Sequence, residues 1–325
     1  MTFDAKMTDI ALQTEHLTKR FGSLTAVDDL SLEVRAGEIF GFLGPNGAGK
    51  TTSISMMCGL LKPDSGRVLV QGRPVDAADA DVRARVGVCP QETTLWEKLT
   101  CLEQLEFVGE MYGVPRREAH RRGAELLETL GLAERGCSLA GKLSGGMRRR
   151  LNLALALVHD PQIVVLDEPE AGLDPQSRVL VREYIRSLPA KASGTLARRK
   201  TVILTTHNMD EADRLADRVA IIDRGRLLTV DTPEALKRSV GEGDVLEVEL
   251  ERIEVGEALR LLADLAPAAT AINHSVVVRG RDVAALLPDI LQALRTAGAE
   301  IRDIHLRSSS LEDVFIALTG KRLRE

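Results

Sequence analysis

The chain has 325 residues, of which 44% are hydrophobic, 28% are charged and 3% are aromatic, a length that favours one large domain and a smaller one. The net charge is −5, and residues 1–241 carry equal numbers of basic and acidic side chains, which disfavours a nucleic-acid partner. No apolar run approaches the roughly 20 residues that span a bilayer, and Met1–Ile10 lacks the core of a signal peptide. We therefore expect a cytosolic chain. The cysteines form no C-x-x-C pair and indicate no disulfide framework or zinc site, so we expect reduced, mostly buried thiols at Cys58, Cys89, Cys101 and Cys137.

Residues 1–241 alternate short apolar runs with helical patterns, which is typical of an α/β domain. The runs predict buried strands at Ile39–Leu43, Ile163–Leu166, Val202–Leu204 and Val219–Ile222. Between about residues 98 and 160 the pattern becomes helical, and Thr100 and Glu103 fit a capping box at the start of a helix. We therefore expect a mixed, mainly parallel sheet with a helical subdomain, and ligands at the carboxyl ends of the strands.

A domain boundary is predicted at residues 241 and 242, beside the glycines of Gly241–Gly243. After it, Leu246, Val248 and Leu250 alternate with glutamates, the pattern of a half-buried strand. One face of a following helix is predicted to carry Leu286, Leu287, Ile290, Leu291 and Leu294. Residues 242–325 are thus expected to form a small α+β domain.

A glycine-rich segment follows the first predicted strand and matches the pattern G-x-x-x-x-G-K-[ST] of phosphate-binding loops. Its residues are Gly44, Pro45, Asn46, Gly47, Ala48, Gly49, Lys50 and Thr51. Glycines let backbone N–H groups turn toward an anion, and the start of the following helix attracts the same anion. Lys50 is expected to contact the β- and γ-phosphates, Thr51 to bind Mg²⁺, and Thr52 to complete the nucleotide site. Alone, the segment leaves kinases, GTPases and ATPases open.

Two further segments have residues suited to phosphate chemistry. One is a strand that ends in two acids, and the other is the start of a helix. The predicted strand at Ile163–Leu166 ends in Asp167, which can hold Mg²⁺, and Glu168, which can orient or deprotonate water. Ser144 precedes a long helical pattern, and with Gly145 and Gly146 it forms a second helix-start anion site.

These three segments resemble, respectively, the Walker A, Walker B and signature motifs of ATP-binding cassette proteins, and along the chain they follow that family's order, with the signature segment before the Walker B segment. The resemblance covers about Ile10 to Leu236 and implies ATP and Mg²⁺ as cofactors. It also implies roles for Gln91, a Mg²⁺ and water contact in the Q-loop, Asp174 in the D-loop, His207, a switch histidine on the γ-phosphate, and Phe21, a stacking partner of adenine.

The resemblance implies that two cassettes pair head to tail, so one cassette per chain indicates a homodimer or a pair with a similar subunit. The tail from Ser310 to Gly320 and the run from Met147 to Leu151 are similar to daunorubicin-resistance-type exporter ATPases. A drug, lipid or other amphipathic molecule would then be exported through a separate membrane permease, with this chain bound at the cytoplasmic face of a bacterial or archaeal membrane. A soluble ATPase of translation or DNA repair, and the ATPase of an ion or importer system, are the alternatives.

Glu170 stands where the family often has Thr or Ser, and we expect it to face solvent or an arginine. For the arginines at 148, 149 and 150, a solvated helix face is favoured over the alternative of three ligands. The segment from Thr94 to Thr100 follows Gln91, where the family docks its permease, and Trp96 and Leu99 are either exposed for that contact or packed locally.

Overall fold

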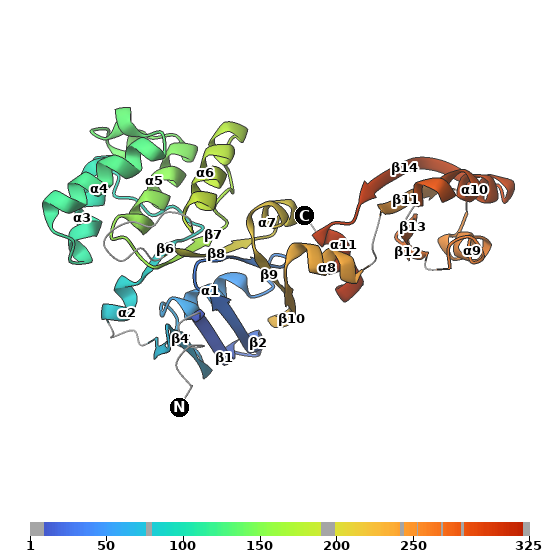
Figure 1. Cartoon of the computed structure of the whole chain (residues 1–325), viewed down its shortest axis with the longest axis horizontal. Coiled ribbons are helices and arrows are strands. Elements are labelled where there is room, and N and C mark those ends of the chain that lie inside the picture. The colour runs from blue at the N-terminus through green and yellow to red at the C-terminus, as the bar shows by residue number, and fades with distance from the viewer. Residues whose placement is uncertain are drawn as a thin grey trace. The chain divides into compact units, whose positions relative to one another are not determined.

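The computed structural model describes residues 10–75, 80–189, 199–240, 244–251, 253–267, 269–280 and 283–320 (Figure 1). The chain divides into two compact units, Met1–Thr232 and Pro233–Glu325. This division lies earlier than the predicted one at 241/242, because the helix that follows Thr232 packs on the last helix of the chain. Residues 241–243, which the sequence suggested as the boundary, lie outside the described residues.

A six-stranded sheet forms the centre of the first unit, with the strand order β10-β9-β3-β8-β7-β6. Its strands are β3 (Ile39–Leu43), β6 (Val86–Cys89), β7 (Ile163–Asp167), β8 (Thr201–Thr206), β9 (Arg218–Asp223) and β10 (Arg226–Asp231). All neighbours run parallel except β9 and β10, which are antiparallel. The four predicted strands are confirmed as β3, β7, β8 and β9, and their carboxyl ends share one edge of the sheet.

A second, antiparallel sheet of four strands in the order β2-β1-β4-β5 completes the β-structure of this unit. Its strands are β1 (Ile10–Phe21), β2 (Leu24–Arg35), β4 (Ser65–Val70) and β5 (Arg73–Pro74). This sheet was not predicted from the sequence. The pairing of β1 and β2 shifts register four times, and such bulges interrupt the alternation of apolar and polar residues that reveals a strand.

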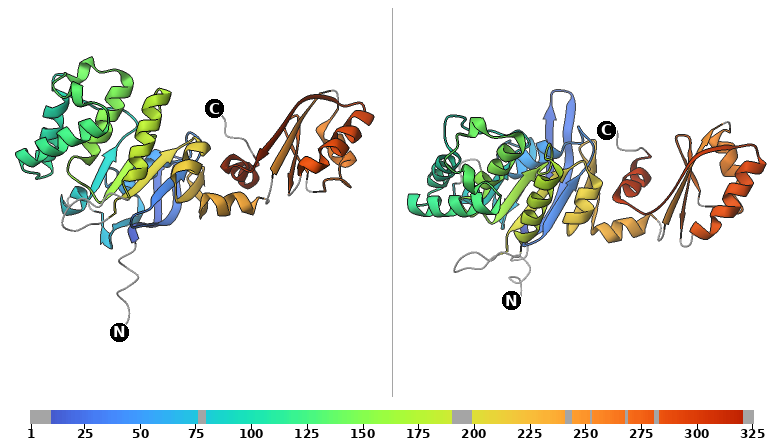
Figure 2. Two further views of the ribbon diagram at one scale, coloured as in Figure 1. Left: turned by 45° about the horizontal axis from the view of Figure 1, so that its top comes forward. Right: turned by 90° about the horizontal axis from the view of Figure 1, so that it is seen from above.

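Seven helices are described in the first unit, in two groups. Four of them each connect two strands as a single helix: α1 (Lys50–Met57), α2 (Ala80–Ala84), α6 (Pro175–Ser187) and α7 (Met209–Leu215). The predicted helical subdomain contains α3 (Cys101–Met111), α4 (Arg116–Thr129) and α5 (Gly145–Leu157), with short 3₁₀ turns at Ala133–Arg135 and Ala140–Lys142. Thr100 begins α3 with the predicted capping box. Figure 2 shows α3, α4 and α5 gathered together, away from the blue antiparallel strands.

The six-stranded sheet separates two apolar cores because its side chains alternate between its faces. On β7, Val164 and Leu166 belong to a core shared with α6 and with the helical subdomain. Ile163 and Val165 belong to a second core, which includes side chains of α1, β1 and β2. The carboxyl edge of the sheet is therefore supported from both faces.

The second unit has a βαββαβ core with one helix before it and one after it. Its elements are α8 (Pro233–Ser239), β11 (Asp244–Glu251), α9 (Val255–Leu261), β12 (Thr270–Ile272), β13 (Ser275–Gly280), α10 (Val283–Thr296), β14 (Glu300–Ser308) and α11 (Leu311–Thr319). The strand order β12-β13-β11-β14 with all pairs antiparallel is that of ferredoxin-like folds. Leu246, Val248 and Leu250 form its core with Ile290 and Leu294, as their spacing predicted.

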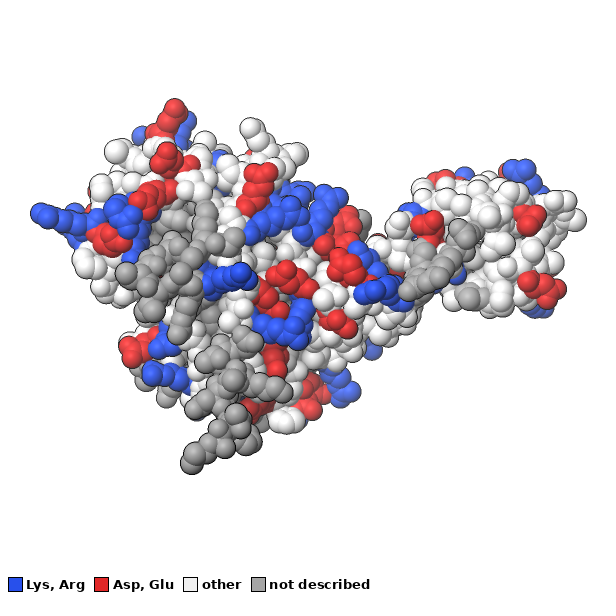
Figure 3. Space-filling view, in the orientation of Figure 1, with Lys and Arg blue, Asp and Glu red and all other residues white. Residues whose placement is uncertain are grey.

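The thiols largely follow the prediction: Cys58, Cys89 and Cys101 are buried, whereas Cys137 is exposed. Burial raises the pKa of Cys58 to about 12 and that of Cys89 to about 11. None of the helices in the described part of the chain has the length and apolar character that crossing a bilayer would require. On the face that Figure 3 shows, basic and acidic side chains are interspersed over the first unit.

Candidate functional site

The glycine-rich segment lies between the end of β3 and the start of α1, as predicted. Two of its glycines have no room for a side chain. A Cβ at Gly44 would lie 2.5 Å from the carbonyl oxygen of Ile222, and one at Gly49 would lie 2.4 Å from that of Ala26. Gly47 and Gly49 also have φ angles of 79° and 100°, which favour glycine. The loop is therefore packed against the neighbouring strands, and its open backbone fits the oxygens of a phosphate chain.

Lys50, the first residue of α1, is only 6% exposed. Its Nζ donates hydrogen bonds to the carbonyl oxygens of Gly44, at 2.6 Å, and Pro45, at 3.1 Å. Burial lowers the pKa of Lys50, and the negative charges of Glu168 and Asp167 partly oppose that effect. The ammonium group of Lys50 is thus held inside the phosphate loop, where burial removes part of its hydration. An anionic ligand would offset that loss.

Oxygen atoms of the kind that Mg²⁺ prefers meet at the end of β7. The Thr51 hydroxyl donates to Asp167 Oδ2 at 3.2 Å, and the Thr205 hydroxyl donates to Asp167 Oδ1. Asp167 is 4% exposed, so its carboxylate is fixed rather than freely solvated. A hydroxyl and a carboxylate beside the phosphate loop fit a magnesium ion, which takes few protein ligands and keeps the rest for phosphate and water.

Glu168 lies between the two other residues that the sequence analysis placed in the catalytic group. Its Oε2 accepts a hydrogen bond of 3.1 Å from Gln91 Nε2, and its Oε1 lies 2.8 Å from His207 Nδ1. Its backbone is in the left-handed region, with φ of 49°, where non-glycine residues are uncommon and which costs about 1–3 kcal/mol. The structure therefore brings Gln91, Glu168 and His207 together, and fixes the carboxylate at the carboxyl edge of the sheet.

A cleft of about 630 Å³ opens over the phosphate loop, within the range of about 300–1,000 Å³ usual for ligand pockets. The predicted residues that line it are Phe21, Asn46, Gly47, Gly49, Lys50, Thr51, Thr52, Gln91 and Glu168. Phe21 is 51% exposed at its rim, with Lys19 Nζ 5.7 Å from the ring centre, so the ring has a free face.

Four residues of this cleft were not predicted: Leu24, Thr25, Ala26 and Arg224. The first three belong to β2, in the sheet that the sequence analysis missed. Arg224 is exposed in the turn between β9 and β10 with φ of 48°, and its neighbours form no motif that marks it as a ligand. Only the fold brings this second cation to the cleft.

The signature and D-loop residues are in place as helix caps, but they do not line the cleft of their own chain. Ser144 caps α5 and accepts a hydrogen bond of 3.3 Å from the backbone N of Met147. Asp174 caps α6 and accepts a hydrogen bond of 2.9 Å from the backbone N of Ser177. A Cβ at Gly145 would meet no atom within 4 Å, so the start of α5 presents an open backbone.

Glu170 is paired with an arginine, which was one of its two expected environments. It is 5% exposed, and Arg182 holds both of its oxygens at 2.8 and 2.5 Å.

The expectation for the arginine triplet was wrong for Arg149, which is 5% exposed. In the segment from Thr94 to Thr100, Trp96 is 46% exposed, and its ring packs edge-on against that of Phe107 with 5.3 Å between the ring centres. Trp96 is therefore partly exposed and partly packed locally, so each of the two expected environments holds in part. Leu99 is half-buried.

A buried carboxyl lies beneath the histidine segment and was not predicted. Glu211 is 6% exposed, and its Oε2 accepts a hydrogen bond of 2.5 Å from the Thr206 hydroxyl. Its Oε1 has no hydrogen-bond partner among the described residues. Burial raises the pKa of Glu211 to about 7, with Glu170 and Glu168 adding to the effect and Arg182 opposing it.

We expect Glu211→Gln to stabilise the protein at pH 8 but not at pH 5. The unfolded carboxyl ionises near its ordinary pKa of 4.5 and the folded one near 7, so the free energy of unfolding falls as pH rises between these values. The difference amounts to roughly 3 kcal/mol at most. Denaturant unfolding of both proteins at pH 5 and pH 8 measures it, and an equal difference at the two pH values would contradict the assignment.

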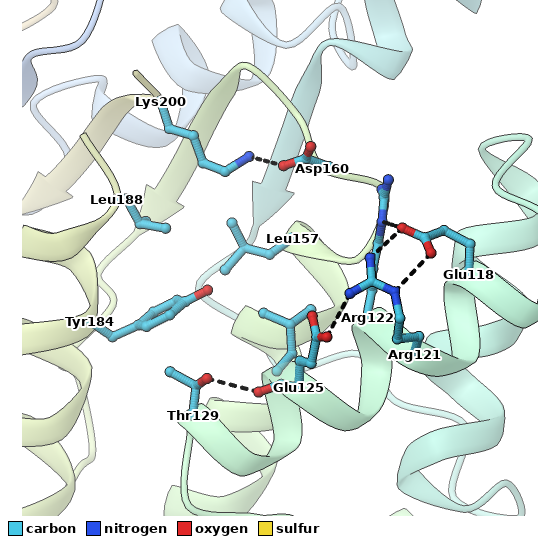
Figure 4. A pocket seen from close by; sticks show the side chains of 11 residues that line it. Glu118, Arg121, Arg122, Glu125, Thr129, Leu157, Asp160, Tyr184, Leu188 and Lys200 are labelled. Carbon is cyan, nitrogen blue, oxygen red and sulfur yellow. Dashed lines mark hydrogen bonds and ion pairs between the residues drawn. The ribbon is translucent and has the colours of Figure 1, made fainter. Parts of the chain in front are cut away.

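A second cavity, of about 410 Å³, lies between α4 and α6. Figure 4 shows that its charged side chains bind one another: Arg121 pairs with Glu118 and Glu125, and Lys200 pairs with Asp160. These cations are already neutralised, so this cavity offers a phosphate less than the cleft above the glycine-rich loop does.

Family models match both units of the chain. The model for ABC transporters matches residues 27–171, and that for the C-terminal domain of DrrA1-3-like ATP-binding proteins matches residues 232–319. The daunorubicin resistance ATP-binding protein DrrA2 of Streptomyces coeruleorubidus is 41% identical and covers 97% of each chain. The Nod factor export ATP-binding protein I of Ralstonia nicotianae is also 41% identical, over 97% of this chain and 95% of that protein.

Solved structures agree with the fold of the first unit. The ADP conformation of MJ1267, an ATP-binding cassette of an ABC transporter, is 27% identical with a TM-score of 0.60, over 70% of this chain and 92% of that one. The ATP-binding cassette MJ0796, a dimeric structure bound to ADP and Pi, has a TM-score of 0.61 at 24% identity, over 68% and 98% of the two chains. The chain therefore belongs to the family of ABC transporter ATP-binding proteins, and its enzymatic activity is that of an ATPase.

Proposed function

We propose that this ATPase drives the export of a drug, lipid or other amphipathic molecule through a separate membrane permease. The observation that carries this proposal is the likeness over 97% of the chain to proteins named for drug resistance and for Nod factor export. The match of the second unit to the DrrA1-3-like C-terminal domain supports the same class of exporter. The chain would then work at the cytoplasmic face of the membrane.

Within the cleft, we assign nucleotide binding to the phosphate loop and adenine stacking to Phe21. Magnesium would be held by Thr51 and Asp167 with the help of Gln91, and it would supply charge neutralisation at the phosphates. Glu168 is assigned as the base that orients and deprotonates water, because its carboxylate is held beside the loop by Gln91 and His207. His207, 53% exposed in its side chain, can turn toward the γ-phosphate.

The proposed active form is a dimer, as a homodimer or with a similar subunit. Ser144, Gly145, Gly146 and Asp174 lie outside the cleft of their own chain, although the start of α5 is an open anion-binding helix end. A second copy would place these residues over the phosphates. That MJ0796, of the same fold, is dimeric with ADP and Pi agrees with this arrangement.

Purification of the tagged chain from membranes in mild detergent tests the export proposal. We expect an integral membrane protein to co-purify in stoichiometric amount and to raise the ATPase rate when the pair is reconstituted in lipid. A chain that brings down ribosomes or nucleic acid, or no partner at all, would overturn it.

We expect Trp96→Ala to weaken the capture of that membrane protein by about tenfold, because an exposed aromatic anchor often dominates a docking surface. Leu60→Ala is the matched control, since Leu60 is 70% exposed and lies outside the docking segment. Pull-down yield and the stimulated ATPase rate are compared for both variants. Equal losses in the two, or none in Trp96→Ala, would remove the docking role of Trp96.

A further inference from the structure

The three consecutive arginines of α5 have three different environments. Arg148 forms an exposed ion pair with Glu97 at 3.0 Å, and Arg150 donates to the carbonyl oxygens of Leu130 and Gly131, just after α4. Arg149 is buried, and its guanidinium donates to five backbone carbonyls, those of Pro90, Gln91, Asp167, Glu168 and Pro169. Guanidinium has five N–H donors, so every donor of Arg149 is used.

These carbonyls belong to two segments that are far apart in the sequence. Nη1 of Arg149 reaches the segment after β6, at 2.5 Å from the oxygen of Pro90 and 2.9 Å from that of Gln91. Nη2 reaches the segment after β7, at 2.5 Å from the oxygen of Asp167 and 2.8 Å from that of Glu168. One planar group thus joins the backbones whose side chains, Gln91 and Glu168, also bind each other.

The second segment needs such support because Glu168 has a left-handed backbone, with φ of 49°. Strained residues of this kind persist only where their surroundings determine the conformation. The N–H of Glu168 is held by Thr205 at 3.1 Å, and its carbonyl is held by Arg149. Without Arg149, the peptides on both sides of this strained residue lose charge-assisted hydrogen bonds, which are the stronger kind.

The same helix holds the first segment at a second point. Asn152, one turn after Arg149, donates to the carbonyl oxygen of Pro90 at 3.3 Å and lies 3.4 Å from Cys89 Sγ. Arg148 holds Glu97 further along. The start of α5 is therefore bonded to the Gln91 segment at several points, but to the Glu168 backbone through Arg149 alone among the contacts described.

We propose that Arg149 is a positioning residue for ATP hydrolysis, which sets the Gln91 and Glu168 backbones in mutual register from the helix that begins with the signature residues. Its guanidinium binds backbone carbonyls and does not line the cleft. This inference rests on the proposed roles of Glu168 and Gln91 and adds the device that aligns them. A shift of about 1 Å in such a group can lower a rate about 100-fold.

Arg149→Lys in the full-length chain tests the proposal, because lysine keeps the charge but has three donors at one centre and cannot span both segments. We expect kcat to fall at least tenfold while the KM for ATP stays within about threefold. Arg150→Lys is the matched control. Arg150 also donates from α5 to backbone carbonyls, but these lie outside the site, so the kcat of this variant should stay within about twofold of the parent value.

Turnover is expressed per ATP bound, so that misfolded molecules do not count. Three outcomes would overturn the proposal, because Arg149 would then be structural only. They are a loss of kcat that disappears once turnover is divided by bound ATP, equal losses of kcat in the two variants, and an Arg149→Lys protein that binds no ATP. Glu168→Gln is measured in parallel. If Glu168→Gln turns over normally, the proposed role of Glu168 fails; if it is inactive while Arg149→Lys turns over normally, only the positioning role fails.

Discussion

Glu168→Gln is expected to lower kcat about 100- to 10,000-fold while ATP binding is retained. The amide has nearly the shape of the carboxylate and can still accept a hydrogen bond from Gln91, but it cannot take a proton from water. The phosphate loop, with Lys50, does not depend on Glu168 for its hydrogen bonds. Bound ATP should therefore persist and hold two chains together, since hydrolysis is what would release them.

Phosphate release, nucleotide affinity and sedimentation with ATP measure these three effects. Glu183→Gln is the control for the chemical change, because Glu183 is exposed on α6 and does not line the cleft. Turnover of Glu168→Gln near the parent rate would exclude Glu168 as the base. An inactive variant that stays monomeric with ATP would instead contradict the ATP-held dimer.

Lys50→Met is expected to raise the Kd for ATP about 10- to 100-fold without destabilising the protein in the absence of nucleotide. A hydrogen bond to a charged group contributes about 1.5–3 kcal/mol, and each 1.4 kcal/mol is about a factor of ten in affinity. In the free protein, however, burial disfavours the charged amine and lowers its pKa. An apolar side chain of similar length removes that cost, so stability and nucleotide binding should respond oppositely.

Thermal unfolding with and without ATP measures both quantities. The parent should gain in Tm as ATP is added, because ligand binding to the folded state stabilises it, and Lys50→Met should lose that gain. Lys62→Met is the control, since Lys62 is exposed and outside the cleft. A Tm of Lys50→Met well below that of the parent without ATP would show that Lys50 stabilises the fold.

The parallel strands could be predicted because they are buried on both faces, which makes them short apolar runs such as Ile39–Leu43. The β1–β2 ribbon could not, because its bulges shift which residues face the core. At the site, residues in a fixed local order were predictable: the phosphate loop, and the two acids at the end of β7. Pairing partners distant in sequence were predictable only through the family resemblance, as with His207.

Arg149 and Arg224 show what sequence reasoning missed. Arg149 lies among three arginines on a helix start, where charge alone indicates solvent, and its five acceptors are carbonyl groups that any residue provides. Arg224 reaches the cleft through the β9–β10 turn, which depends on how the two sheets pack. Arg149 binds backbone carbonyls and Arg224 lines the open cleft, and neither arrangement leaves a pattern in the sequence.

The distribution of thiols offers a spectroscopic probe that needs no engineering. Cys58, Cys89 and Cys101 are buried, and burial raises the pKa of each, so they form little of the reactive thiolate at neutral pH. Cys137 is exposed in the stretch between α4 and α5. A maleimide fluorophore would therefore label the helical subdomain at one position of the natural chain, and its emission would follow that subdomain through each cycle of nucleotide binding and release.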